Sequence, residues 1–86
     1  MSAAAASLSD KALAVFAFAA YHQLESGQPV TSVIRSDGAG HKADEEAVSE
    51  LVGQQLIASD GNDLVFSQQG LNILARIIEG LRTAAA

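Results

Sequence analysis

The sequence contains no cysteine, which excludes both disulfide bonds and thiolate metal sites. Basic residues are scarce as well, because five lysines and arginines stand against ten acidic residues and give a formal net charge of −5. A charge of this sign disfavours nonspecific binding to DNA, RNA or an anionic membrane. The single proline and the 49% apolar content differ from the composition of a disordered acidic tail, so the chain is expected to fold.

Long hydrophobic runs are also missing. The longest apolar run, residues 12–21, is about half the length that a membrane span requires. The same run does not fit a secretory leader, because Asp10 offsets the charge of Lys11 where such a leader has a positive start. We therefore expect a soluble, cytoplasmic protein that does not bind membranes.

The chain is short: 86 residues can form one hydrophobic core and no second domain. Residues 1–6 are an alanine-rich lead with little to bury, and residues 83–86 are a similar tail. We expect the lead to be disordered, residues 7–82 to form a single domain, and the tail to be frayed.

A first helix is expected to begin near Ser7 or Ser9, to run to about Ser26 and to stop at Gly27. Its apolar side chains form two roughly opposite stripes. The first stripe contains Leu13, Phe16, Ala17, Ala20 and Leu24, and the second contains Val15, Phe18 and His22.

A helix that is apolar on two sides is covered on two sides, and a domain of this size has little material with which to cover the second side. We therefore predict that Val15, Phe18 and His22 face a second chain, which makes the protein a homodimer. The alternative is a central helix that the rest of a small fold surrounds.

The middle of the chain predicts short elements. Residues 28–31 are expected to be extended, because Pro29 keeps the preceding residue out of the helical region. A brief helix is expected over residues 33–35, ended by the turn residues 37–40. A longer helix should then start around Lys42 to Asp44 and run to about Gln54.

A hairpin and a last helix follow. The apolar runs of residues 56–59 and 64–67 flank Asp60-Gly61-Asn62-Asp63, which predicts a β-hairpin. Ser67 is a suitable N-cap for the last helix. Apolar residues cover a wide arc of that helix, so its Ile73 and Ile77 edge is a second candidate surface for a partner.

The order helix, short strand, helix, turn, helix, hairpin and helix over residues 8–82 resembles the winged helix-turn-helix family with an added C-terminal helix, as in many small dimeric bacterial regulators. LVGQQLI at residues 51–57 is similar to that family's join between recognition helix and wing, where an L-x-x-x-G-L-I type of sequence is common. The chain departs at Gln55, which stands where glycine usually ends the helix in a left-handed conformation. The fold class so implied is mostly α with a small β-hairpin, an α+β fold.

The resemblance implies that the exposed face of the third helix reads nucleic acid. In this chain that face would be Glu45, Glu46, Ser49 and Glu50, and the wing tip would be residues 60–63. Carboxylates repel phosphates, and affinity for DNA rests largely on lysine and arginine. The sequence therefore argues against the use that the resemblance implies.

Two observations qualify this conclusion. Arg35, His41 and Lys42 cluster near the same surface and are the alternative DNA contacts. The acids at Asp44 to Glu46 also have a purely structural explanation, because negative charge in the first turn of a helix is stabilised by the helix dipole.

Enzymatic chemistry is not expected. His41 and Glu45 share a helix spacing, but two ligands without a third nearby make a weak metal site. Residues 38–42 lack the spacing of a phosphate-binding loop. No nucleophile, base and orienting group can be assembled, so we expect no catalytic residue, no metal and no cofactor.

Three functions are compatible with these patterns. The favoured one is a regulatory or adaptor module that binds protein, itself or another chain, through its apolar helix faces. The second is a transcriptional regulator that contacts DNA weakly through Arg35, His41 and Lys42. The third is an acidic mimic of nucleic acid that occupies a basic protein.

Overall fold

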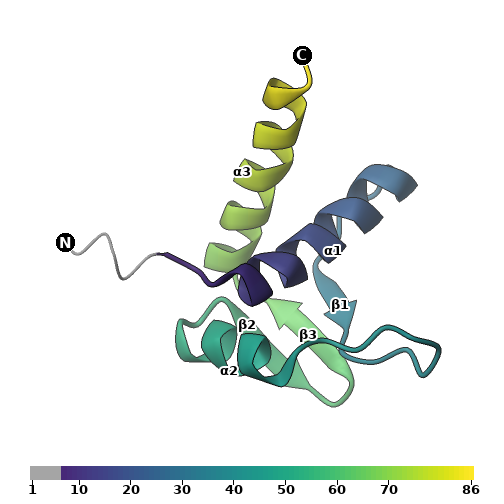
Figure 1. Ribbon diagram of the computed structural model, residues 1–86, viewed down its shortest axis with the longest axis vertical. Coiled ribbons are helices and arrows are strands. Elements are labelled where there is room, and N and C mark those ends of the chain that lie inside the picture. Colours follow the sequence, from purple (N-terminus) through teal and green to yellow (C-terminus); the bar gives the residue numbers. More distant parts are fainter. Residues whose placement is uncertain (1–6) are drawn as a thin grey trace.

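The computed structural model describes residues 7–86, so the disorder expected over residues 1–6 lies outside the described residues. The elements follow in the order α1 (Asp10–Ser26), β1 (Ser32–Ile34), α2 (Glu45–Gly53), β2 (Ile57–Asp60), β3 (Asp63–Phe66) and α3 (Gln68–Ala84). Three helices and a three-stranded antiparallel sheet make an α+β fold, as expected from the sequence (Figure 1).

Polar caps define where the helices begin. The Ser9 hydroxyl accepts a hydrogen bond from the Ala12 N–H, so α1 begins after Ser9 and not after Ser7. Gly27 ends α1 in the left-handed conformation, with φ of 74°. The Ser67 hydroxyl accepts the Gly70 N–H and caps α3. These caps satisfy backbone groups that the first and last turns of a helix leave without partners.

Residues 32–34 form strand β1, so the brief helix expected over residues 33–35 is wrong. Val33 is buried, whereas Ser32 and Ile34 on either side of it are exposed. This alternation suits a strand with one covered face, and β-branched residues favour strands. Pairing of Val33 with Leu64 supplies the backbone partners that a helix of three residues would lack. The extended segment expected at residues 28–31 therefore continues into a strand.

The sheet has the order β1-β3-β2, so β3 is its central strand. Ile57 of β2 pairs with Phe66 of β3, and Asp60 pairs with Asp63. This register leaves only Gly61 and Asn62 in the hairpin turn, which is shorter than the four-residue loop expected. Gly61 has φ of 60°, a conformation that glycine adopts without steric cost.

The core lies where α1, α2 and the inner face of the sheet meet. Its largest fully buried side chains are Phe16, Leu51 and Leu64, one from each of these elements. The Phe16 ring stacks on the Phe66 ring, with centroids 5.3 Å apart. Helix α1 therefore lies against the sheet along the side that carries Phe16.

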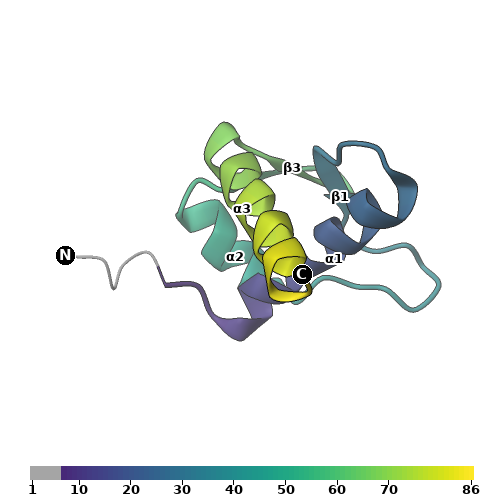
Figure 2. The same ribbon diagram turned by 90° about the horizontal axis from the view of Figure 1, so that it is seen from above.

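Helix α3 leaves this core as it proceeds. Leu74 and Ile78 are buried, but Leu81 is 51% exposed. The C-terminal half of α3 extends beyond the rest of the molecule (Figure 1), and in the view from above α3 stands over its centre (Figure 2). The helix continues to Ala84, so the frayed tail expected from residue 83 is helical for two residues more than predicted.

Candidate functional site

Asp44, which directly precedes α2, has a structural role. Its carboxylate accepts hydrogen bonds from the N–H groups of Glu46, at 2.9 Å, and Ala47, at 3.1 Å. Asp44 is thus the N-cap of α2. The bond from the Ala47 N–H lowers the pKa of Asp44 below its ordinary value, and the charge of Lys11 acts in the same direction.

Glu50 holds the start of another helix. Its carboxylate accepts a hydrogen bond from the Ser9 hydroxyl at 2.6 Å and one from the Ser9 N–H at 3.0 Å. These bonds lower the pKa of Glu50, the hydroxyl contributing most. Because Ser9 is the N-cap of α1, Glu50 supports that cap from α2.

Lys11 completes this contact between α1 and α2. Its ammonium group lies 2.9 Å from a Glu46 carboxylate oxygen and 3.5 Å from one of Asp44. The hydrogen bond with Glu46 is the main cause that raises the pKa of Lys11. These pairs are exposed, so they orient the helices more than they stabilise the fold.

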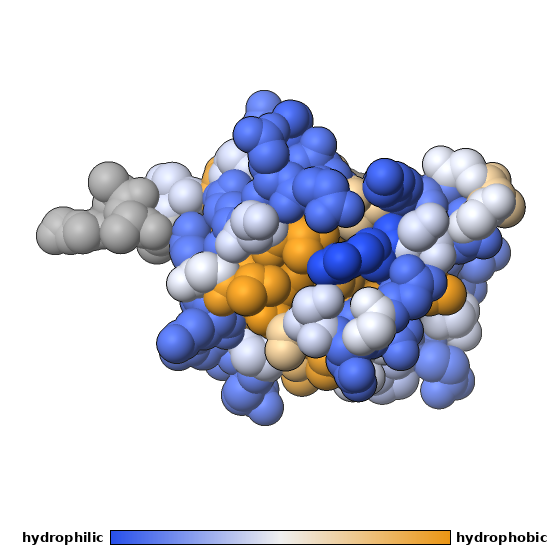
Figure 3. Space-filling model, turned by 90° about the horizontal axis from the view of Figure 1, so that it is seen from below, coloured by the Kyte–Doolittle hydropathy of each residue, from blue (hydrophilic) through white to orange (hydrophobic). Residues whose placement is uncertain are grey.

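The predicted recognition surface is therefore divided between two roles. Glu46 and Glu50 contact the start of α1, whereas Glu45 and Ser49 remain exposed. Val52 lies close to these two on the helix surface and is 41% exposed. The underside of the molecule, where α2 and the hairpin lie, carries an apolar patch with polar side chains around it (Figure 3). The free face of α2 is thus partly apolar.

Arg35, His41 and Lys42 do not form one basic cluster. The Arg35 guanidinium donates a hydrogen bond to the Ser59 hydroxyl at 2.9 Å and so contacts the hairpin. The His41 ring turns towards α1, where it stacks on Phe18. Lys42 lies just before α2 and is exposed. Arg35 and His41 therefore contact other parts of the fold, and Lys42 is the one exposed residue of the three.

The loop of residues 35–43, which carries these side chains, is held in place by hydrogen bonds. Asp37 accepts the N–H groups of Ala39 and His41, and the bond from Ala39 is the main cause that lowers the pKa of Asp37. The Asn62 amide accepts the Ser36 N–H and donates to the Ser36 carbonyl at 2.6 Å. The hairpin turn thus binds the loop through Asn62, a role that its position in the sequence did not suggest.

Phe18 and His41 form a parallel stack, with ring centroids 3.9 Å apart and an interplanar angle of 3°. Nε2 of His41 lies 3.0 Å from the carbonyl oxygen of Ile34. Since a carbonyl only accepts, Nε2 carries the proton and donates it. The His22 and Phe18 rings form a T-shaped pair, with ring centroids 4.4 Å apart. The loop therefore covers Phe18 with an aromatic side chain from the same chain.

The two apolar stripes of α1 differ in which of their side chains the fold covers. Val15 is buried in the domain's own core, so it does not lie on a surface that a second chain could cover. Phe18 is half-buried under the loop, and His22 is exposed. In the first stripe, by contrast, Leu13 and Leu24 are 42% and 43% exposed. Each stripe is therefore partly covered, because Phe16 and Ala20 of the first stripe and Val15 of the second are buried in the core.

A groove lies between α1 and α3, and the sequence identified only its α3 side, at Ile73 and Ile77. Ile73 and Ile77 are half-buried, and with Leu8, Leu13 and Arg76 they line an open hollow of about 470 Å³. Leu13 and Leu81 were missed as interface candidates because both fit the apolar pattern of a core. Both are exposed because α3 diverges from α1. The periodicity of apolar residues along one helix does not predict the angle between two helices.

Neither a metal site nor a membrane span emerges from the geometry. Within residues 7–86 there is no group of three histidine, cysteine, aspartate or glutamate side chains that could hold a metal ion. Over the same residues, none of the helices combines the length and the apolar character needed to cross a bilayer.

Comparisons with protein-family models, curated proteins and solved structures found no match.

Proposed function

We propose that the protein is a regulatory or adaptor module that binds protein, and that it associates with a second copy of itself through the groove between α1 and α3. The observation that supports this proposal is the projecting end of α3. Leu81 there is 51% exposed and lies one helical turn beyond Ile77 of the groove, and Leu13, which lines the groove, is 42% exposed. Contiguous apolar surface with a polar border is typical of protein interfaces.

Burial of this surface supplies the driving force. Covering one large aliphatic side chain completely is worth about 1.5 to 3 kcal/mol. Leu13 and Leu81 are 42% and 51% exposed, so each would contribute roughly half of that, whereas Leu8, Ile73 and Ile77 are already partly buried and would contribute less. Two copies would bury the groove residues of both chains. Several such side chains offset the entropy cost of association at micromolar concentration.

Gly80 gives independent support for a close approach of another helix. Glycine in a helix interior costs about 1 kcal/mol relative to alanine. A Cβ at Gly80 would meet nothing within 4 Å among residues 7–86, so packing within the chain does not require a glycine there. Gly80 follows Ile73 and Ile77 at helical spacing and lies on the same side of α3. A second chain packed against this side explains the glycine.

We further propose that the fold is a winged helix with an added C-terminal helix. In its support, the chain has a helix, a strand, a helix, a hairpin and a helix in that order, and β3 lies between β1 and β2. It departs from the family in the segment before α2, where the loop of residues 35–43 replaces a helix. On this frame α2 occupies the position of the recognition helix, and its carboxylates disfavour DNA as the target.

Sedimentation of the full chain over a range of concentrations tests the proposed self-association. We expect a dimer at high micromolar protein, and we expect Leu81→Glu to weaken it at least about tenfold, which corresponds to about 1.4 kcal/mol. Val52→Glu is the matched control, because Val52 is 41% exposed but lies on α2 and does not line the groove. Circular dichroism establishes that both variants are folded.

Two results would contradict the proposal. A wild-type chain that stays monomeric at high micromolar concentration removes self-association. Loss of the dimer in Val52→Glu with no change in Leu81→Glu moves the interface to the apolar underside shown in Figure 3.

A further inference from the structure

A second hollow, of about 300 Å³, opens between α1 and the loop that leads into α2. Its walls are apolar and come from Ala14, Val15, Phe18, Val33 and Ala43. A volume of this size is at the lower end of small-molecule sites, which combine apolar walls with a few polar groups. It lies on the Lys11 and Phe18 side of α1, away from the Leu13 side that lines the groove with α3.

The stacked pair of Phe18 and His41 lines both this hollow and another of about 290 Å³. Both hollows are lined by Phe18, Val33 and His41. The two parallel aromatic rings therefore contribute to the lining of both hollows. A planar ligand can lie against such rings through an offset or edge-on contact.

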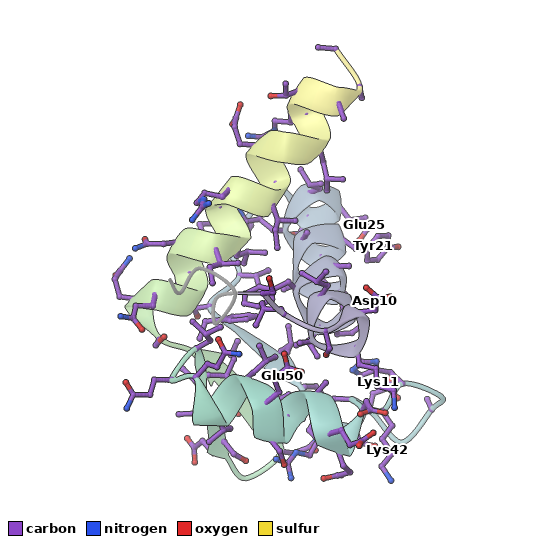
Figure 4. The ribbon with its side chains drawn as sticks, turned by 60° about the vertical axis from the view of Figure 1, so that its left-hand side comes forward. Asp10, Lys11, Tyr21, Glu25, Lys42 and Glu50 are labelled. Atoms are coloured by element: carbon purple, nitrogen blue, oxygen red, sulfur yellow. The ribbon has the colours of Figure 1, made fainter. Side chains whose placement is uncertain are left out.

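The polar groups of the hollow are basic on balance. Lys11 and Lys42 line it with one carboxylate, that of Asp44. In Figure 4 the two lysines lie on the same side of the molecule, near the starts of α1 and α2. Lys11 is committed to Glu46 and Asp44, whereas Lys42 forms no salt bridge within residues 7–86. Lys42 is thus the cation available to a ligand.

Nearby acids limit the charge that this site accepts. Glu45 and Glu46 border Lys42 from the start of α2, together with Asp44. Asp44 and Glu46 are partly neutralised by Lys11, but Glu45 has no such partner among residues 7–86. Two lysines and three carboxylates leave this region with a net charge of −1, so one negative charge on a ligand can pair with Lys42 at a smaller repulsive cost than the two charges of a phosphate ester.

We propose that this hollow binds a small, flat, apolar molecule that carries one carboxylate. The carboxylate pairs with Lys42, and the apolar body lies on Ala14, Val33 and the Phe18 ring. The outer wall is formed before binding, because Asp37 and Asn62 hold the loop through hydrogen bonds to its backbone. A preformed site avoids the cost of ordering a loop on binding.

Amide chemical shifts of the full chain, followed by NMR during titration with 2-naphthoate, test this proposal. We expect saturable shifts at residues 14, 18, 33 and 43 that surround the hollow. The neutral naphthalene-2-carboxamide and the doubly charged 2-naphthyl phosphate should both bind about fivefold more weakly, the effect expected of one partly exposed ion pair. A higher affinity for the carboxylate than for either analogue is the result expected only of a site for one negative charge.

Variants separate the two parts of the site. Lys42→Gln should reduce the affinity for 2-naphthoate to that of the carboxamide and leave the carboxamide unchanged. Arg82→Gln removes the same charge from the exposed end of α3 and should change neither ligand. Ala14→Leu should fill the hollow and weaken all three ligands. Leu81→Glu should leave 2-naphthoate binding intact, because the site does not depend on self-association.

Three outcomes would overturn the proposal. Linear, nonsaturating shifts at millimolar 2-naphthoate show that the hollow holds no such ligand. Equal affinity for carboxylate and carboxamide, or no effect of Lys42→Gln, removes the charge pairing. Tighter binding of the phosphate ester excludes a site for a single charge.

Discussion

The carboxylate of Glu50 on α2 accepts two hydrogen bonds from Ser9, the residue that caps α1. The same Ser9 hydroxyl accepts the N–H of Ala12 in the first turn of α1. One carboxylate therefore supports the start of a helix 41 positions earlier in the chain. An acid that the winged-helix resemblance places on a DNA-reading face is used within the fold.

Acid is expected to destabilise the fold because it protonates three carboxylates that accept hydrogen bonds, one of which is Glu50. The pKa values of Asp37, Asp44 and Glu50 are lowered by their hydrogen bonds. The stability that these carboxylates contribute is fully present above their ordinary values, 3.8 for aspartate and 4.5 for glutamate, and is lost as pH falls through the lowered values. The melting temperature should be level near neutrality and fall below about pH 4.5.

Glu50→Gln should lower the melting temperature at neutral pH and reduce the size of the fall in acid, because one of the three carboxylates is gone. Glu25→Gln, in the last turn of α1, is the control and should leave the acid transition as it is. An acid transition that is identical in Glu50→Gln and wild type would show that the Ser9 contact contributes nothing.

Gln55→Gly is expected to stabilise the protein. Gln55 has φ of 60°, a left-handed conformation that costs a residue with a Cβ roughly 1 to 2 kcal/mol. Glycine removes this cost but loses more entropy on folding, so we expect a net gain of about 0.5 to 1 kcal/mol in the free energy of unfolding. Urea unfolding measures it. Gln54→Gly, at φ of −93°, is the matched control and should destabilise.

Two glycines of α3 should respond to alanine in opposite ways. A Cβ at Gly70 would overlap the backbone carbonyl oxygen of Leu56, so Gly70→Ala should cost about 1 to 3 kcal/mol. Gly80→Ala meets open space within residues 7–86 and should stabilise the monomer by up to about 1 kcal/mol. Urea unfolding at low protein concentration compares them. Equal effects would mean that α3 does not pack closely on Leu56.

DNA binding is expected to be absent. Arg35 contacts the hairpin and His41 stacks on α1, which leaves Lys42 as the exposed base near α2, whereas Glu45 and the hairpin acids remain exposed. A gel shift with mixed duplex DNA at low salt should show no retardation at tens of micromolar protein. Retardation that falls steeply with salt would instead indicate phosphate contacts and would revive the DNA-binding alternative.

The ends of the elements were predictable from the sequence because they depend on local chemistry. Ser9, Gly27 and Ser67 define the start or end of a helix through bonds to neighbouring residues. Gln55 was interpreted as a departure from the helix-to-hairpin join, because glycine is usual there, but Gln55 itself adopts the left-handed conformation, with φ of 60°. In each case the partner lies within a few positions in the chain.

Strand β1 and the covered side of α1 were not predictable, because their partners are distant in the sequence. Val33 becomes a strand residue through Leu64, and Phe18 is covered through His41. The loop that carries His41 is in turn held by Asn62 of the hairpin turn. Periodicity indicates that a side chain is apolar, but which surface covers it depends on these contacts.

The position of β3 between its two neighbours has a kinetic consequence. Its partner β2 is joined to it by a turn of two residues, whereas Val33 of β1 pairs with Leu64 across the whole of α2. Closing the larger loop costs more chain entropy, so the hairpin should form early and β1 should add to it late. Substitutions in β1 should then accelerate unfolding more than they slow folding.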